Sequence, residues 1–468
     1  MRSGYVKALS ILAAAVGALR RLPLEGAIRL AVPATVVAVA LGSNWSPSVR
    51  QVAQPLWKLL LVLLCALAAA FALAHAPTRE LWERVRSPAY VLAAVVVALA
   101  AASTIWSADP RLTIQRAVSF ALVLTTAAAL GLAAGGDRPL VERLLVAVAA
   151  GPVAVALIGL LALVVTPHNA LQSATQTIPA RYRGIGQNPN TVAMLLAATL
   201  PLVTWFALEW RGRRRLAAAA ATVLLAASVV GSGSRGALAT AAAGCILVAV
   251  VAASTSRGRA LAAIAVVAAA AVAVGFGEIP QPDPTATAVA GPGCRLCTHR
   301  PNDADATLRL EDEFGAPNGA APGARRTLFA STGRSQAWEG AIDQAQERPV
   351  AGYGFGTEDH VFVDRYYSFF GGAPENSYVG LFLQLGLVGL LLVLALVVAL
   401  LAGCVAGIRR LDGRARGAAA ACTAVACAGI VLAVVQSYIY AAGNNATLTI
   451  WLCAFLGLAL AARPVGAR

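Results

Sequence analysis

Charged side chains are scarce in this 468-residue chain: 13% of its residues are Asp, Glu, Lys or Arg, while 59% are hydrophobic. That shortage excludes an ordinary soluble domain. The apolar runs, of about 17 to 25 residues, match the hydrocarbon thickness of a bilayer. Because every backbone polar group of a membrane-spanning segment must be satisfied within that segment, these runs are expected to be helices. The sequence therefore predicts an all-α polytopic membrane protein.

Two further absences narrow the class. No motif recurs with a period of about 20 to 50 residues, which excludes a solenoid and gives no sign of an inverted repeat. Acidic residues number only 22 against 37 basic ones, and the net charge is +15. The positive residues nevertheless lie mostly at the edges of the apolar runs, where anionic lipid head groups attract them. Membrane lipid is thus the expected partner of this charge, and nucleic acid is not.

Hydropathy predicts about twelve membrane spans and one large loop. The domain organisation comprises an N-terminal segment at 1–25, nine spans within 26–276, the loop at 277–374, three spans within 375–462 and a tail at 463–468. The first span is short, and an interfacial position is its alternative. The spans are expected at residues 26–41, 55–74, 88–105, 114–134, 140–165, 191–208, 216–230, 237–253, 260–276, 377–402, 415–436 and 446–462.

Lysine and arginine indicate the orientation, because short cytoplasmic loops accumulate them. With the N-terminus inside, cytoplasmic segments hold roughly 22 of the 37 basic residues and short outer segments about seven. Both termini are then expected in the cytoplasm and the 277–374 loop outside. Residues 1–25 have the basic start and apolar middle of a signal peptide, but no clear small-residue cleavage site follows, so they are interpreted as an uncleaved cytoplasmic or interfacial helix.

The eight cysteines fall into two groups. Six lie in apolar runs and are expected to be small buried hydrophobic residues. Cys294 and Cys297 form a C-x-x-C pair in the outer loop, and a local disulfide on the oxidising side of the membrane is the leading interpretation. A metal site or a free thiol pair is the alternative, although a second metal-binding pair is absent.

A short helix is predicted inside the outer loop. Thr332 can cap it, Arg334 lies in its first turn, and Pro349 stops it. The glycine-rich sequence 352–356 follows and allows a tight turn with close backbone approach. It is a weak signal for a phosphate-binding loop, because it matches no dinucleotide fingerprint. The apolar positions of the helix recur at helical spacing at Trp338, Ile342 and Ala345.

Polar residues gather where helices meet the outer face. Glu375 lies at the outer start of the span at 377–402, either as a carboxylate that caps the helix and interacts with its dipole or as a base at the membrane surface. Arg235, Arg181 and Arg183 also lie at outer helix ends. Arginine is costly near hydrocarbon and presents a fixed fork suited to phosphate oxygens. Several arginines on one face would bind an anionic lipid head group. For any single arginine the alternative is that its side chain snorkels to the membrane surface or pairs with a carboxylate such as Asp109.

The order of the motifs along the chain is the most specific signal, and it resembles the O-antigen ligase and bacterial polysaccharide polymerase superfamily over roughly residues 104–402. Each motif alone is loose. They are, in order, Trp106-Ser107-Ala108-Asp109-Pro110 with Thr113 and Arg116; Arg183-Gly184 with Asn188-Pro189-Asn190; Gly233-Ser234-Arg235-Gly236; Gly333-Arg334 with Trp338, Pro349 and Gly352-Tyr353-Gly354; and Glu375-Asn376-Ser377-Tyr378 with Gly386-Leu387-Val388-Gly389.

Members of that superfamily act on the outer side of the bacterial cytoplasmic membrane, where they transfer a glycan from undecaprenyl pyrophosphate to an acceptor sugar. The resemblance implies that Arg235 and Arg334 bind and neutralise the pyrophosphate leaving group, with Arg181 or Arg183 assisting. Preorganised guanidinium groups suit this role because they stabilise charge left on phosphate. No cofactor is expected, and no metal need be invoked. The implied substrate-binding residues also include Asn190, Asn376 and Tyr378.

One position departs from the superfamily pattern. Ligases usually carry histidine followed by asparagine where this chain has Glu375-Asn376, and none of its four histidines lies there. A glutamate can still deprotonate an acceptor hydroxyl, so Glu375 is the expected catalytic base. The further candidates for the base, close by in the sequence, are Glu358, Asp359 and Asp364. The departure leaves polymerase and ligase both open.

A transporter or flippase for a lipid or solute is the main alternative, since a bundle of about twelve helices suits it equally well. Transporters, however, concentrate charged or helix-breaking residues near the bilayer midplane, whereas here such residues lie at the outer interface or in the large loop. A structural scaffold leaves the order of the arginine motifs unexplained. The sequence therefore favours a membrane glycosyltransferase with a lipid-linked glycan donor.

Overall fold

The computed structural model describes residues 22–75, 78–173, 180–253, 334–362 and 373–462. Within these ranges nine helices are long and apolar enough to span a membrane, which confirms the all-α membrane fold. They are α2 (Leu24–Gly42), α3 (Pro47–His75), α5 (Pro88–Ala102) continued by the 3-10 turn η1 (Ser103–Ile105), α6 (Pro110–Ala134), α7 (Arg138–Val165), α9 (Pro189–Glu209), α10 (Gly212–Gly231), α16 (Ser377–Arg410) and α17 (Gly413–Leu432).

Two shorter apolar helices, α11 (Arg235–Ala253) and α18 (Thr447–Ala461), match two more predicted spans. The remaining predicted span, residues 260–276, lies outside the described residues, as do Cys294 and Cys297. The six other cysteines carry free thiols, and five of them are buried, as their apolar surroundings predicted. The short elements are α4 (Thr78–Val85), α8 (Pro167–Ala170), α14 (Arg334–Ala345), α15 (Glu358–Val361) and the antiparallel strand pair β1 (Leu171–Gln172) and β2 (Arg181–Tyr182).

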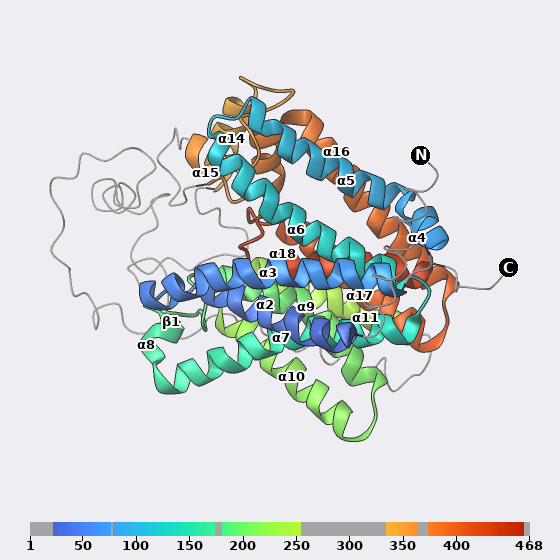
Figure 1. The fold of residues 1–468 in the computed structure, drawn as a ribbon. Coiled ribbons are helices and arrows are strands. Elements are labelled where there is room, and N and C mark those ends of the chain that lie inside the picture. Colours follow the sequence, from blue (N-terminus) through green and yellow to red (C-terminus); the bar gives the residue numbers. More distant parts are fainter. Residues whose placement is uncertain (1–21, 76–77, 174–179, 254–333, 363–372, 463–468) are drawn as a thin grey trace.

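Successive spanning helices run in opposite directions, so their connections lie at two opposite ends of the bundle (Figure 1). One end, called here the loop end, carries α8, β1, α14 and α15. The opposite end, called here the basic end, carries the arginine-rich turns from α9 to α10 and from α16 to α17. Every described residue that the sequence singled out as a site candidate belongs to the loop end.

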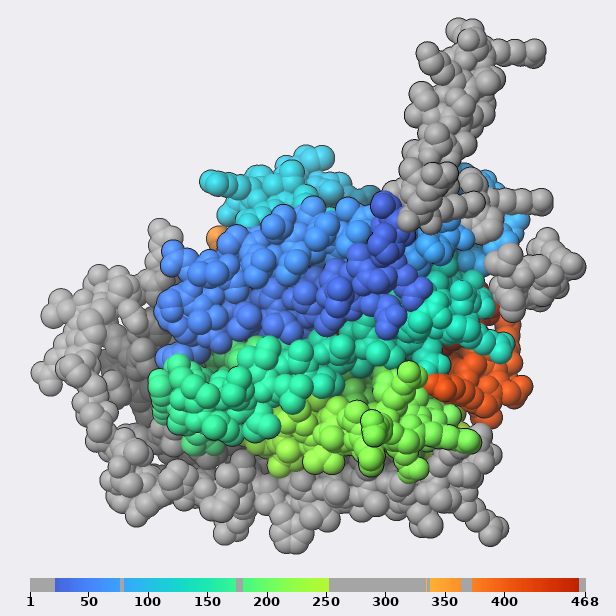
Figure 2. Space-filling view, turned by 60° about the horizontal axis from the view of Figure 1, so that its bottom comes forward, coloured from blue at the N-terminus to red at the C-terminus, as the bar shows by residue number. Residues whose placement is uncertain are grey.

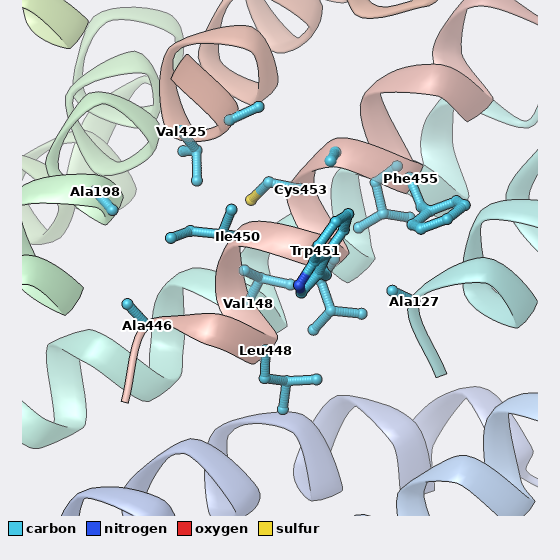
Figure 3. Packing of buried hydrophobic residues seen from close by; sticks show 14 of the residues in the cluster. Ala127, Val148, Ala198, Val425, Ala446, Leu448, Ile450, Trp451, Cys453 and Phe455 are labelled. Atoms are coloured by element: carbon cyan, nitrogen blue, oxygen red, sulfur yellow. The ribbon is translucent and has the colours of Figure 1, made fainter. Parts of the chain in front are cut away.

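The centre of the bundle is formed by helices that are apolar all round. In α9, 83% of the most apolar stretch is buried, against 28% in α10, which lies on the outside beside α7 (Figure 2). Trp451 and Phe455 of α18 point toward neighbours that include Ala127 and Val148 (Figure 3). Small residues allow the close approach: a β-carbon at Gly457 would lie 2.5 Å from the Sγ atom of Cys404. Such contacts are typical of helix packing in membranes.

Helix α16 is broken near its start by Gly386, whose φ of 63° and ψ of −165° are not helical. Backbone groups released by the break need partners in a membrane, and the segment 349–354 supplies them. The carbonyl of Gln384 accepts from the amide of Gly354 at 2.8 Å, and the amide of Leu387 donates to the carbonyl of Pro349 at 2.8 Å. The loop after α14 is therefore attached to α16 at the break, near the loop end of that helix.

Two of the helix ends that differ from those expected are at α16 and α17. Helix α17 ends at Leu432 rather than 436, because the next residues turn to bond the start of α16; α16 runs on to Arg410 instead of 402. Helix α14 exists as predicted, but its buried face is different. Ala337, Ala341 and Ala345 are buried there, whereas Ile342 is 37% exposed. The small alanine face lets α14 pack closely on α16, beside Leu383.

Candidate functional site

The centre of the candidate site is an ion pair between the starts of α14 and α16. Nη2 of Arg334, the first residue of α14, lies 2.6 Å from Oε2 of Glu375, and its Nε lies 3.1 Å from the same oxygen. The two side chains remain 27% and 23% exposed. Trp338, one turn along α14, donates from Nε1 to the carbonyl of Pro374 at 2.8 Å. The structure thus joins the predicted base to one predicted phosphate-binding arginine.

Arg235 approaches this pair from α11. Its guanidinium group is buried in part and lies within range of electrostatic repulsion from the guanidinium of Arg334. The next residue, Gly236, lies against Val435, since a β-carbon added at Gly236 would be 3.4 Å from the Val435 side chain. Two residues before Val435, the carbonyl of Ala433 accepts a hydrogen bond of 2.7 Å from the backbone amide of Ser377. The starts of α11, α14 and α16 therefore meet. Two positive groups and one carboxylate share this corner of the loop end.

The backbone at Glu375 is strained. Its φ of 46° makes it the single non-glycine residue with positive φ in the described ranges, and a left-handed conformation costs an L-residue roughly 1–2 kcal/mol. The capping interpretation of Glu375 is wrong, because the side chain of Asn376 caps α16 and accepts from the amides of Tyr378 and Val379. Strain held in a residue that does not cap its helix points to a functional role.

Asn376 and Tyr378, expected to bind substrate, make contacts that hold the start of α16. The amide of Asn376 donates to Oγ of Ser437 at 3.1 Å. The hydroxyl of Tyr378 donates to the carbonyl of Ile430 at 2.8 Å, across to α17. These contacts fix the backbone on which Glu375 is presented.

Arg181, at the start of β2, and Asn190, in the first turn of α9, are hydrogen-bonded to each other and do not contact the ion pair directly. Nη2 of Arg181 donates to Oδ1 of Asn190 at 2.5 Å, and Nε donates to the carbonyl of Ser232 at 2.6 Å. Ser232 begins the turn that leads into Arg235. The buried Arg181 side chain therefore positions the segment that carries Arg235.

Arg183 belongs to a different neighbourhood. Its Nε and Nη2 donate to the carbonyls of Asn169 and His168 at 2.9 and 3.1 Å, and its guanidinium lies 4.4 Å from the centre of the Trp45 ring. Burial lowers the pKa of Arg183 from its usual value. These contacts hold the α8 turn, so the structure does not bring Arg183 to the ion pair.

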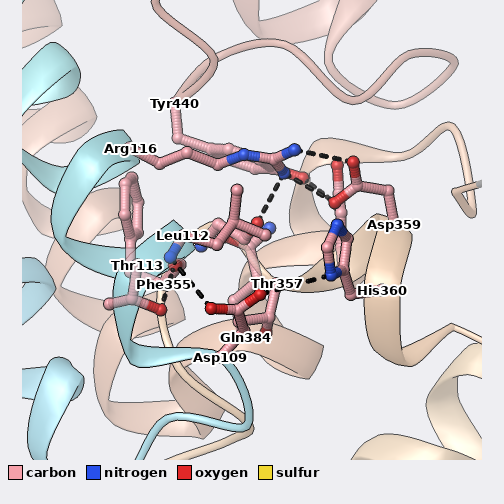
Figure 4. A network of polar contacts seen from close by, with 12 residues as sticks. Asp109, Leu112, Thr113, Arg116, Phe355, Thr357, Asp359, His360, Gln384 and Tyr440 are labelled. Carbon is pink, nitrogen blue, oxygen red and sulfur yellow. Dashed lines mark hydrogen bonds and ion pairs between the residues drawn. The ribbon is translucent and has the colours of Figure 1, made fainter.

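Residues of the early motif 106–116 hold the loop 352–360 in place through hydrogen bonds (Figure 4). Thr113 Oγ1 donates to the carbonyl of Phe355 at 2.8 Å. Arg116 donates to the carbonyl of Gly356 at 2.5 Å and pairs with both carboxylate oxygens of Asp359 at 2.6 Å. Asp109 caps α6 and lies 3.5 Å from Nδ1 of His360. Asp109 therefore pairs with histidine rather than with one of the arginines at the ion pair.

The glycines of the run 352–356 allow its backbone to pack closely against α16 and the start of α6. Its three glycines have positive φ, and a β-carbon at Gly354 would overlap Ser107. The amide of Gly356 donates to Oε1 of Gln384 at 2.5 Å, and that of Gly354 is used at the break in α16. The expected close backbone approach is confirmed. Because these two amides are bound within the protein, they are not available to cradle a phosphate.

Glu358 is a buried carboxylic acid beneath the start of α16. It accepts a hydrogen bond from the hydroxyl of Tyr440, and a β-carbon at Gly380 would overlap both groups. Burial, assisted by the negative charge of Asp359, raises the pKa of Glu358 to about 7, while Tyr440, Arg116 and Gln384 act in the opposite direction. Sequence reasoning held Glu358 only in reserve and missed Tyr440. No local signal marked Tyr440, because Gly380, which makes room for the contact, is one of five glycines in α16.

Glu358→Gln is expected to remove a pH dependence of stability. Folding raises the pKa of Glu358 from 4.5 to about 7. Its stabilising contribution is therefore fully present below about pH 4.5 and is lost as pH rises through about 7. Glutamine keeps the shape without titrating. Thermal unfolding in detergent across this range should show a larger loss for the wild type than for the variant, whereas Glu347→Gln, at a half-exposed tyrosine contact, should behave as wild type. Equal losses in all three would contradict the assignment.

Comparison with known protein families gives a match to part of the chain. A sequence model of the family described as O-antigen ligase matches residues 220–394. The matched stretch runs from within α10 into α16 and contains Arg235, Arg334 and Glu375. The resemblance to the O-antigen ligase superfamily is thereby confirmed over these residues, while the motifs at 106–116 and 183–190 lie outside the match. No curated protein matches the chain.

Proposed function

We propose that this protein is a bacterial membrane glycosyltransferase that takes a glycan from undecaprenyl pyrophosphate and transfers it to an acceptor glycan on the extracytoplasmic face. The observation that carries the proposal is the Arg334–Glu375 ion pair beside Arg235 at the loop end. Polymerisation of repeat units and ligation of a finished glycan use the same bond chemistry. Both therefore fit this arrangement.

The arrangement suggests an order of events. Before the donor binds, Glu375 partly neutralises Arg334, and it also lessens the repulsion that Arg334 exerts on Arg235. An incoming pyrophosphate carries more charge than a carboxylate and accepts several charge-assisted hydrogen bonds. It replaces Glu375 as the partner of Arg334 and is held by both arginines. The exchange leaves the carboxylate of Glu375 available to accept a proton.

The transfer step then follows. The oxygen of an acceptor hydroxyl attacks the anomeric carbon of the donor, and its proton passes to Glu375 as the new bond forms. The bond between that carbon and the phosphate oxygen breaks, and the electron pair remains on the lipid pyrophosphate. Arg235 and Arg334 stabilise the developing charge with guanidinium groups that are already in place. The lipid pyrophosphate then leaves the two arginines, and proton release from Glu375 to solvent completes the cycle.

Activity in detergent tests the function against the transporter alternative. Micelles contain no closed compartments, so transport cannot be observed there, whereas glycosyl transfer can. The purified full chain, supplied with a lipid-linked glycan and an acceptor, is expected to form longer glycans. Movement of the lipid-linked glycan across sealed vesicles, with no new glycosidic bond in micelles, would favour a flippase instead.

The sidedness of the site is tested by thiol labelling at two introduced cysteines. Val350, which is 64% exposed, lies at the loop end, and the exposed Arg213 lies at the basic end. With Cys294 and Cys297 replaced by alanine, a membrane-impermeant maleimide should label Val350→Cys in intact spheroplasts. Arg213→Cys should react only after permeabilisation. The reverse pattern would place the site in the cytoplasm and reject extracytoplasmic transfer.

A further inference from the structure

Two arginine-rich turns lie side by side at the basic end. Four arginines lie in the turn from α9 to α10 or in the first turn of α10, and four lie in the helix ends that flank the turn from α16 to α17. Glu142 of α7 links them, since its carboxylate pairs with Arg414 and accepts from Nε1 of Trp210 at 3.5 Å. Figure 2 shows α10 beside the orange surface near the start of α17. The arginines are Arg211, Arg213, Arg214, Arg215, Arg409, Arg410, Arg414 and Arg416.

The charge of this surface is strongly unbalanced. Seven of the eight arginines are exposed, all but Arg416. Between 209 and 216 and between 409 and 416 the chain has only two carboxylates, Glu209 and Asp412, and no lysine. Topology requires positive charge of either kind at a membrane edge. A set made of arginine alone favours bidentate bonding to phosphate oxygens, which lysine does not provide.

An apolar groove on α16 ends at two of these arginines. Its volume is about 470 Å³, and Arg409 and Arg410 form its polar end. The helix is exposed along the groove, as Val398 at 64% shows. The groove is open on the side away from α16, as a site for an acyl chain at a helix surface has to be. The apolar wall is formed by Val398, Leu401, Ala402, Val405 and Ala406.

We propose that this groove binds an anionic phospholipid, with its phosphate on Arg409 and Arg410 and an acyl chain along α16. A groove with an apolar wall and a cationic end matches a molecule with a hydrocarbon chain and an anionic head, and basic pockets of this kind at membrane edges bind acidic lipids. The neighbouring arginines add long-range attraction. The site is at the opposite end of the bundle from the ion pair and does not depend on the proposed transfer reaction.

Binding of phosphatidylglycerol to the purified full chain tests the proposal, with native mass spectrometry as the readout and phosphatidylcholine as the neutral comparison. Replacing Arg409 and Arg410 with glutamine is expected to weaken phosphatidylglycerol binding by about 10- to 30-fold, from roughly 1 kcal/mol per arginine. The matched control, Arg213→Gln with Arg214→Gln, removes the same charge from the same end outside the groove. It should weaken binding by no more than about 3-fold.

A third variant tests the groove without changing charge. Ala402→Phe fills the exposed apolar wall and keeps both arginines, so it should weaken phosphatidylglycerol binding, while glycerophosphoglycerol, which lacks acyl chains, should not compete. Equal losses in the two arginine double variants would overturn the site in favour of general charge attraction. So would equal binding of phosphatidylcholine, or full binding by Ala402→Phe. Effective competition by glycerophosphoglycerol would show a phosphate site without a lipid chain.

Discussion

Glu375→Gln is expected to lower the rate of glycosyl transfer by about 10²- to 10⁴-fold, the range typical for loss of a general base. Glutamine keeps the size of the side chain and can still accept a bond from Arg334, but it cannot take the acceptor proton. Donor binding should be retained or slightly tightened, because the carboxylate no longer competes with pyrophosphate for Arg334. Steady-state transfer and donor affinity, measured on the same preparation, separate the two effects.

The strained backbone supplies a control for the same position. Glycine adopts a φ of 46° without the cost that glutamate bears. Glu375→Gly should therefore fold at least as well as wild type and still fail in transfer. Near-normal transfer by Glu375→Gln, in membranes supplied with lipid-linked glycan, would reject the role of base and leave Glu375 as a partner of Arg334 alone.

Arg334→Lys is expected to reduce turnover by about 10²- to 10³-fold, as for loss of a preorganised donor to a developing anion. Lysine keeps the charge but loses the planar fork that reaches two phosphate oxygens. Arg235→Lys should have a similar effect, since the leaving group carries charge that has to be met from more than one direction. Transfer rates at saturating donor measure this loss apart from weakened binding.

The matched control is Arg348→Lys, in the same loop. Arg348 lies 4.7 Å from the centre of the Tyr353 ring, outside the ion pair, and its replacement should leave turnover within about 3-fold of wild type. If all three lysine variants behave alike, positive charge near the loop is sufficient and the forked geometry of Arg235 and Arg334 is not needed.

The spanning helices were predictable because their signal is strong and local. A run of some 20 apolar residues has few alternatives in a bilayer, and eleven predicted spans coincide with described helices. Their ends were less predictable, because long-range contacts decide them. Helix α17 stops at Leu432 since the following residues bond the start of α16, and the break at Gly386 is stabilised by a loop some 35 residues earlier in the chain.

The site was predictable as a set of residues on one face and not as a geometry. Hydropathy placed Arg235, Arg334 and Glu375 at the same end, but nothing local fixes a 2.6 Å ion pair between residues 41 positions apart. Arg181 and Arg183 looked equivalent in sequence, and tertiary contacts gave them different partners. The raised pKa of Glu358 likewise depends on burial beneath α16, which no short motif encodes.

The proposed transfer reaction is tested most directly by counting both products of a single turnover in detergent micelles. The purified protein is loaded with lipid-linked glycan, acceptor is added, and lipid pyrophosphate and new glycosidic bonds are quantified together. We expect one lipid pyrophosphate released for each bond formed by the wild type. Within the time of one wild-type turnover, Glu375→Gln should yield neither product in measurable amount, although its donor remains bound. Bond formation by Glu375→Gln at the wild-type rate, or release of lipid pyrophosphate without new glycosidic bonds, would contradict the proposed reaction.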